Sequence, residues 1–259
     1  MAKVVALANQ KGGVGKTTTA INLSASLAAS ERSELVVDLD PQANATSGFG
    51  LLKNLSPSMY EVLVQGASIE STLLATELPT LQVAPSTPHL VAAEIELSEL
   101  ANREFRLRDA LVAIRERYDY ILIDCPPSLG MLTVNALSAA DSVFVPMQCE
   151  YFALEGISQL VDTIDRVRAS LNPALEIEGI ALTMFDDRIN LARQVSAEIR
   201  SFFGKKVYRS VIPRNVRLGE APSFGKPILL YDIKSKGSES YIQLAREFLG
   251  RAEGARATD

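Results

Sequence analysis

A glycine-rich loop near the start of the chain, ANQKGGVGKTTTAINL, limits the fold more than any other feature. The apolar run KVVALAN precedes the loop and is typical of a buried strand. The segment TTTAINLSASLAAS follows it with the small and apolar residues of a packed helix. Gly12, Gly13 and Gly15 leave the backbone free to turn sharply between the two. A strand, a tight glycine loop and a helix in this order predict the first unit of an α/β protein.

The rest of the chain repeats this alternation. Further strand-like runs are separated by helical patterns: ELVVDLD, LQVAP, YDYILID, SVFVPM, EIEGIALTMF and KVYRSVI. Such a succession implies right-handed crossovers and a mostly parallel twisted sheet with helices on both faces. We therefore predict a single α/β domain over residues 1–250 and a frayed tail over residues 251–259. The segment 50–80 is the least regular, and we expect short helices there over one edge of the sheet.

Composition agrees with a folded protein in a reducing compartment. The chain has 259 residues, of which 47% are hydrophobic and 22% charged. No apolar run approaches the ~20 residues that a membrane-spanning helix needs, and the first residues lack the pattern of a signal peptide. Cys125 and Cys149 do not suggest a disulfide framework. A cytoplasmic location is expected.

The charges are unevenly distributed along the chain. The net charge is −5, yet residues 186–236 contain eleven Lys or Arg against five Asp or Glu, a net of +6. The remainder carries −11. Two interpretations stay open: a basic surface on an acidic body, or ordinary solvated helix faces.

The loop is close to the phosphate-binding pattern G-x-x-x-x-G-K-[ST]. Gly15, Lys16 and Thr17 complete the pattern, but Gln10 stands where its first glycine is expected. Lys16 is predicted to reach the β- and γ-phosphates, and the Thr17 hydroxyl to bind Mg²⁺ directly. The nucleotide is expected to be held by Lys11, Gly12, Gly13, Val14, Gly15, Lys16, Thr17 and Thr18.

Lys11 is a second lysine in a loop that needs only one. It lies on the far side of the glycines, where the backbone directs it outward. Either it is an ordinary surface lysine, or it reaches a nucleotide held by a second copy of the chain.

The segment KGGVGKTT resembles the deviant Walker A loop of the MinD/ParA ATPases, whose signature is the extra lysine. Further blocks resemble the ParA/Soj branch of chromosome- and plasmid-partition ATPases: DLDPQANATSG, YDYILIDCPPSLG, VPMQCEYFALEG and VIPRNVRLGEAPSFGKPI. They occur in family order, and the likeness runs from Lys3 to about Leu249. The resemblance implies a P-loop ATPase of weak intrinsic activity that uses ATP and Mg²⁺.

The resemblance also implies roles for individual residues. Asp124 ends a strand as a Walker B carboxylate does, and is expected to organise Mg²⁺ through water, although capping of the next turn is an alternative. Asp40 matches the aspartate that orients or activates the attacking water, so Lys11, Lys16 and Asp40 are the predicted catalytic residues. Asp38 is expected either to bind metal-coordinated water or to support the loop.

Two further assignments rest on the likeness. It places adenine near IPRN, so we expect an apolar contact from Pro213 and a hydrogen bond from Asn215. Glu150, in QCEYF, is a candidate to reach either the ribose of a second subunit or Lys11.

The family further implies an ATP-dependent sandwich homodimer. Lys11 then neutralises charge on the phosphates of the other subunit, and Gly12 lies where the two backbones approach. A ParB/Spo0J-like partner is expected to stimulate slow hydrolysis and so release the dimer from DNA. The ATP-bound protein is expected to associate with the nucleoid.

Nonspecific binding of double-stranded DNA is expected from the basic segment. The glycine loop begins within the first dozen residues, which leaves no room for the N-terminal helix-turn-helix domain of some relatives. Arg188 and Arg217 match positions that contact DNA in this branch. Their basic neighbours are further candidates: Arg193, Arg209, Arg214 and Lys234.

Two other classes share this loop. A MinD-like membrane-cycling ATPase would need an amphipathic C-terminal anchor, which FLGRAEGARATD does not supply. An iron–sulfur reductase of the nitrogenase iron-protein type bridges its cluster with two thiolates from each chain, a count that Cys125 and Cys149 meet. Cys125, however, directly precedes PPSLG, which matches partition proteins.

Overall fold

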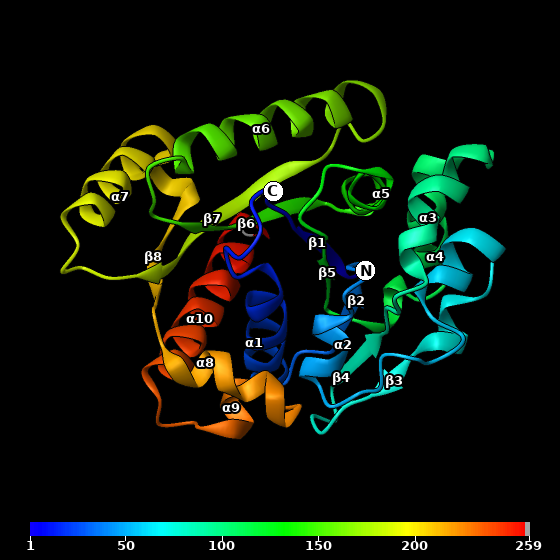
Figure 1. Cartoon of the computed structure of the whole chain (residues 1–259), viewed down its shortest axis with the longest axis horizontal. Helices are drawn as coiled ribbons and strands as arrows, with labels where there is room; N and C mark the ends of the chain where they lie inside the picture. Colours follow the sequence, from blue (N-terminus) through cyan, green and yellow to red (C-terminus); the bar gives the residue numbers. More distant parts are fainter. Residues whose placement is uncertain (257–259) are drawn as a thin grey trace.

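The computed structural model describes residues 1–256, which form an eight-stranded sheet of order β3-β4-β2-β5-β1-β6-β7-β8 (Figure 1). All neighbouring strands are parallel except β3 and β4. The strands are β1 (Lys3–Leu7), β2 (Glu34–Asp38), β3 (Leu74–Ala75), β4 (Leu81–Ala84), β5 (Tyr120–Asp124), β6 (Ser142–Gln148), β7 (Glu176–Phe185) and β8 (Val207–Pro213). The predicted α/β class is confirmed, and every predicted strand is present.

Helices cover both faces of the sheet (Figure 1). One face carries α1 (Lys16–Ala28), α8 (Val216–Glu220), α9 (Ile228–Tyr231) and α10 (Lys236–Arg256). The other carries α3 (Leu90–Glu96), α4 (Arg106–Val112), α5 (Met131–Ala139), α6 (Ala153–Ser170) and α7 (Asn190–Phe203). The short α2 (Asn44–Gly48) follows β2. There are 3₁₀ turns at Ile69–Thr72, Leu97–Glu99, Arg103–Phe105, Arg115–Arg117, Gly204–Lys206 and Ala221–Phe224, and a π-helical turn at Glu61–Gln65.

The central strands are apolar throughout because both of their faces are covered. Along β1, Val4 and Ala6 pack with the α3–α7 layer, whereas Val5 and Leu7 pack with α1 and α10. Because β5 and β6 run parallel to β1 on either side, the loop after β1 lies at the carboxyl edge of the sheet, between the loops that follow β5 and β6. Parallel sheets bind ligands at this edge.

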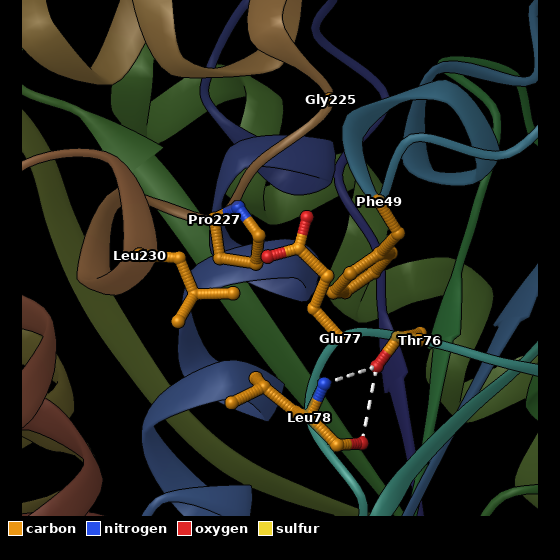
Figure 2. A pocket seen from close by; sticks show the side chains of 7 residues that line it. All are labelled: Phe49, Thr76, Glu77, Leu78, Gly225, Pro227 and Leu230. Atoms are coloured by element: carbon orange, nitrogen blue, oxygen red, sulfur yellow. Dashed lines mark hydrogen bonds between the residues drawn. The ribbon is translucent and has the colours of Figure 1, made fainter.

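The segment 50–80 contains short helical turns as expected, but it also forms β3, an edge strand that the sequence did not predict. A strand of two residues is too short to show alternation. The Thr76 hydroxyl closes the turn after β3 by bonding the backbone N–H and carbonyl of Leu78 (Figure 2). Phe49, Pro227 and Leu230 line a small crevice between this turn and the α9 region (Figure 2).

Beside this crevice two glycines bring distant segments into contact. Gly50 and Gly225 both have left-handed backbones, with φ of 78° and 64°. A Cβ atom on Gly225 would lie 2.6 Å from the Cα of Gly50, which is backbone and cannot swing away. The pair therefore fixes the α2 loop, which follows Asp40, against the turn that follows α8.

Gly225→Ala is expected to lower the free energy of unfolding by about 2–4 kcal/mol, since left-handed strain and overpacking add. Gly66→Ala is the matched control, because Gly66 has φ 75° and its Cβ would meet only an Arg106 nitrogen at 3.5 Å. Gly66→Ala should lower the free energy of unfolding by only about 1–2 kcal/mol, because left-handed strain is its only cost. Urea unfolding of both variants measures the difference, and equal losses would show that the Gly50 contact does not matter.

A buried carboxyl group near the start of β2 predicts a pH-dependent stability. Glu34 is 0% exposed and neither side-chain oxygen makes a hydrogen bond of good geometry to a described residue. Burial, reinforced by the charge of Asp119, raises its pKa well above the usual range. The folded state then holds this proton more tightly than the unfolded state, so stability falls as pH rises above the unfolded pKa of about 4.3.

Glu34→Gln should remove this loss. At pH 8 the free energy of unfolding of the variant should exceed that of the wild type by about 1–3 kcal/mol, so the variant should unfold at a higher temperature. The advantage should shrink toward pH 4. Glu116→Gln changes the same charge at an exposed position and serves as control. Thermal unfolding between pH 4 and 8 is the measurement, and parallel profiles for wild type and Glu34→Gln would contradict the argument.

The predicted frayed tail is wrong for residues 251–256. The helix α10 continues through Arg256, and Arg251 donates to the carbonyl of Val207 at 2.9 Å and to Glu247 at 2.8 Å. The contact with Val207 joins the end of α10 to β8, which is distant in sequence, so local composition could not predict that this segment is ordered. Residues 257–259 lie outside the described residues. No helix among residues 1–256 combines the length and apolar character needed to cross a membrane.

Candidate functional site

The loop between β1 and α1 forms a cradle for an anion. Gly13 and Gly15 have left-handed φ angles of 74° and 88°, a conformation that costs glycine little. No side chain caps α1 at Gly15, so its first N–H groups remain for a ligand. The Thr183 hydroxyl of β7 donates to the Val14 carbonyl at 2.7 Å and holds the loop from behind.

Lys16 lies inside this cradle. It is 6% exposed, and its Nζ donates to the Lys11 carbonyl at 3.3 Å, across the loop. Burial lowers the pKa of Lys16, and the carboxylates of Asp124 and Asp40 oppose that shift. A buried ammonium at the start of a helix is suited to a phosphate group, which supplies the missing negative charge.

Asp124 faces the cradle from the end of β5. It is fully buried, and neither carboxylate oxygen makes a hydrogen bond of good geometry to a described residue. Burial, followed by the charge of Asp38, raises its pKa well above the usual range, while the neighbouring Thr17 hydroxyl opposes the shift. A buried carboxylate whose oxygens make no hydrogen bond of good geometry to the described residues, beside a hydroxyl, is the donor set expected for a hydrated magnesium ion. The residues therefore fit Mg²⁺, with Thr17 and Asp124 to hold it.

Asp38 supports a loop. Its Oδ1 accepts from the Asp40 N–H at 3.1 Å, and its Oδ2 accepts from the N–H and hydroxyl of Thr46 at 2.8 and 2.7 Å. Burial raises its pKa to about 6 despite these bonds. The Thr46 hydroxyl also accepts from the Ser86 N–H at 3.0 Å, which ties α2 to the end of β4. These bonds agree with one of the two predicted roles of Asp38, which is to support the loop after β2. Contact of Asp38 with metal-bound water stays a prediction.

Asp40 lies close enough to Lys16 and Asp124 to interact with their charges. It is 8% exposed, and its Oδ1 accepts from the Gln42 N–H at 2.9 Å. Its charge is among those that favour the charged form of Lys16. A second carboxylate so placed can align a water molecule toward a terminal phosphate.

Lys11 points out of the cradle. Its side chain is 39% exposed and forms an ion pair with Glu150, so the candidate contact between these two residues exists within one chain. Its backbone N–H donates to Asn9 Oδ1 at 3.0 Å, while Asn9 Nδ2 donates to the Pro146 carbonyl at 2.8 Å. Asn9 thus fixes the start of the loop against β6, a role that the sequence interpretation missed.

A pocket of about 350 Å³ adjoins the loop at Gly15. Pro213 and Asn215 line it together with Thr18, which brings the predicted base-binding residues beside the phosphate cradle. Asn215 Oδ1 caps α8 by accepting from the N–H groups of Arg217 and Leu218, so its amide nitrogen is the group left for the base. The pocket is also lined by Thr183, Met184, Val216 and Tyr241, none of which was predicted. Met184 has φ 48°, an uncommon left-handed value that no sequence pattern signals.

Most of the predicted DNA-contact residues lie after the carboxyl ends of β7 and β8. Arg188 is 85% exposed and pairs with Asp186 at 2.7 Å, and Arg217 pairs with Glu220 at 2.9 Å and with Asp232 at 3.6 Å. Exposed pairs of this kind contribute little stability and can exchange their carboxylate for a phosphate. The remaining candidates of this region, all exposed, are Arg193, Arg214 and Lys234.

Arg209 is separated from this group. It lies four residues before Pro213, roughly 13 Å along the strand at ~3.3 Å per residue. Glu247 of α10 accepts from the N–H groups of Arg209 and Ser210 at 2.8 and 2.9 Å. These bonds cover part of the free edge of β8. Arg209 instead lines a pocket together with Arg200, Lys205 and Arg251, and its part in DNA binding stays a prediction.

Known proteins share both the sequence and the arrangement. A family model described as an AAA domain matches residues 2–177. The chain is 60% identical to the chromosome partitioning protein ParA of Myxococcus xanthus, over 96% of this chain and 88% of the relative. It is 55% identical to the sporulation initiation inhibitor protein Soj of Bacillus subtilis, over 95% and 98%. The solved cobyrinic acid a,c-diamide synthase of Mycobacterium smegmatis, with bound ADP and magnesium, matches with a TM-score of 0.86 at 36% identity, over 98% of this chain and 97% of that chain.

The synthase is named for a different reaction, but it shares much less sequence with this chain than the relatives named for partitioning. Those relatives align over 95% or more of the chain. The predicted resemblance is confirmed: the chain belongs to the ParA/Soj family of chromosome-partitioning ATPases.

Proposed function

We propose that this protein binds ATP with Mg²⁺, forms a homodimer around two nucleotides, and in that form binds double-stranded DNA without sequence preference. The observation that carries the proposal is the contrast between the two loop lysines. Lys16 is buried toward the cradle, whereas Lys11 is held at the surface by Glu150. One lysine is suited to a nucleotide of its own subunit and the other to a phosphate outside it.

Hydrolysis follows from the placement of the chain's own groups. The backbone N–H groups of the loop and Lys16 bind the phosphates, and Thr17 and Asp124 hold the metal. Bound Mg²⁺ supplies positive charge that stabilises the phosphate oxygens. Asp40 orients the attacking water, and burial of the site excludes other water. The M. smegmatis structure with ADP and magnesium supports these cofactors.

The ATP-bound dimer binds DNA, and hydrolysis releases it. Dimerisation joins two carboxyl-edge clusters that contain Arg188 and Arg217, so DNA affinity depends on ATP through geometry alone. A ParB/Spo0J-like partner accelerates the slow hydrolysis and releases the dimer, which places the ATP form on the nucleoid. The partitioning names of the relatives support this role.

The iron–sulfur alternative finds no support in the cysteines. Cys125 is 0% exposed in the core and Cys149 is 7% exposed. Burial raises the pKa of Cys149 to about 11 and that of Cys125 further, so neither thiol is presented as a thiolate to a shared cluster.

The test is DNA binding by the purified protein without nucleotide, with ADP, with ATP and with a slowly hydrolysed ATP analogue, alongside its mass in solution. We expect dimers and salt-sensitive binding of any DNA sequence only with ATP or the analogue. Arg188→Ala and Arg217→Ala should each weaken binding to all sequences and reduce the salt slope by about 1. Arg108→Ala, which removes a half-exposed arginine of α4, is the control. A dimer that ignores DNA would contradict the DNA assignment and keep the sandwich.

A further inference from the structure

An exposed pair of aromatic rings lies in the loop between β6 and α6. Tyr151 is 75% exposed and Phe152 is 63% exposed. The rings pack edge to face, with centroids 5.0 Å apart and an interplanar angle of 88°. Neighbouring exposed rings of this size are costly in water and typically mark a contact surface.

The nucleotide loop lies next to this pair. Glu150, the residue before Tyr151, is the ion-pair partner of Lys11. The connection is built into the sheet, because β1 and β6 are parallel neighbours and the Ala8 N–H donates to the Phe144 carbonyl at 3.2 Å. The aromatic pair and Lys11 therefore lie at the same carboxyl edge.

The glycine loop beside Lys11 is open, and the ion pair next to the rings carries no net charge. A Cβ atom on Gly12 would meet only Pro127, at 3.9 Å, and one on Gly13 would meet nothing within 4 Å. Lys11 and Glu150 neutralise each other beside the rings. Interface cores have this composition, since they are depleted in net charge and enriched in aromatic residues.

We propose that Tyr151 and Phe152 form an apolar anchor that packs against a second copy of this chain in the ATP-bound dimer. The inference rests on the proposed function, in which Lys11 reaches the phosphates of the other subunit. A residue that crosses to a second copy lies near the twofold axis, and a patch beside it is covered by the same region of that copy. Desolvation of the rings then contributes affinity, while Lys11 exchanges Glu150 for phosphate.

The test compares two variants for dimerisation by sedimentation with a slowly hydrolysed ATP analogue. Tyr151→Ser combined with Phe152→Ser should weaken the dimer about 30-fold or more, the loss typical of a central aromatic contact. Phe202→Ser is the matched control, because Phe202 is 80% exposed and forms a similar ring pair with Phe203 at the end of α7. It should dimerise as the wild type does.

Binding of a fluorescent ATP analogue tests whether the fold and the cradle are intact. At a protein concentration where all variants are monomeric, the affinity for the analogue should be the same for every variant and the wild type. The exchange variant Tyr151→Phe with Phe152→Tyr should still dimerise, because it keeps the apolar surface. Normal dimerisation of the double serine variant, or failure of the exchange variant, would overturn the anchor. A wild-type chain that stays monomeric with the analogue would instead overturn the proposed dimer.

Discussion

Replacing Lys16 with alanine is expected to lower ATP hydrolysis about 10²–10³-fold, the loss typical of removing one preorganised charge from a transition state. Lys16 is buried, its Nζ lies against the Lys11 carbonyl, and Asp124 and Asp40 contribute negative charge around it. Without its ammonium the cradle keeps two carboxylates that repel phosphate. Binding of ATP should weaken as well, so turnover under saturating ATP and equilibrium binding of a fluorescent analogue are both needed.

Lys11→Ala is the matched control within the same loop. Its side chain is half exposed and pairs with Glu150, so nucleotide binding to the single subunit should stay within about threefold of wild type. Formation of the ATP-dependent dimer, and with it DNA binding, should be lost. If both alanine variants lost nucleotide binding equally, the division of labour between the two lysines would be wrong.

Asp40→Ala is expected to trap the ATP-bound state. Hydrolysis should fall by about 10²–10³, the usual contribution of a group that activates water. The nucleotide should still bind, because the loop N–H groups and Lys16 are unchanged. The dimer and its DNA complex should therefore persist much longer than those of the wild type. Single-turnover hydrolysis and dissociation from DNA after dilution measure the two effects.

Asp40→Asn separates chemistry from loop folding. The asparagine oxygen can still accept from the Gln42 N–H, which Asp40 does at 2.9 Å, but the negative charge is gone. Hydrolysis should fall as far as in Asp40→Ala, with thermal stability closer to wild type. An asparagine variant that hydrolyses ATP normally would limit Asp40 to supporting the loop.

The sequence by itself determined the glycine loop and every strand except β3. Apolar strand runs, the glycines before Lys16 and the carboxylates at strand ends are local patterns, and their physical causes are local too: side-chain periodicity, tolerance of positive φ, and the edge at which parallel strands end. The blocks that resemble ParA/Soj supplied the family.

Only the tertiary structure decided how distant groups meet. Lys11 and Glu150 are 139 positions apart, and their ion pair exists because β6 lies beside β1. Arg209 lies within β8, whereas Arg217 lies in α8 beyond the end of that strand, although the two are close in sequence. Asp124 is fully buried, and its oxygens make no hydrogen bond of good geometry to a described residue. Strand order and burial depend on the packing of the whole chain, and no local pattern encodes them.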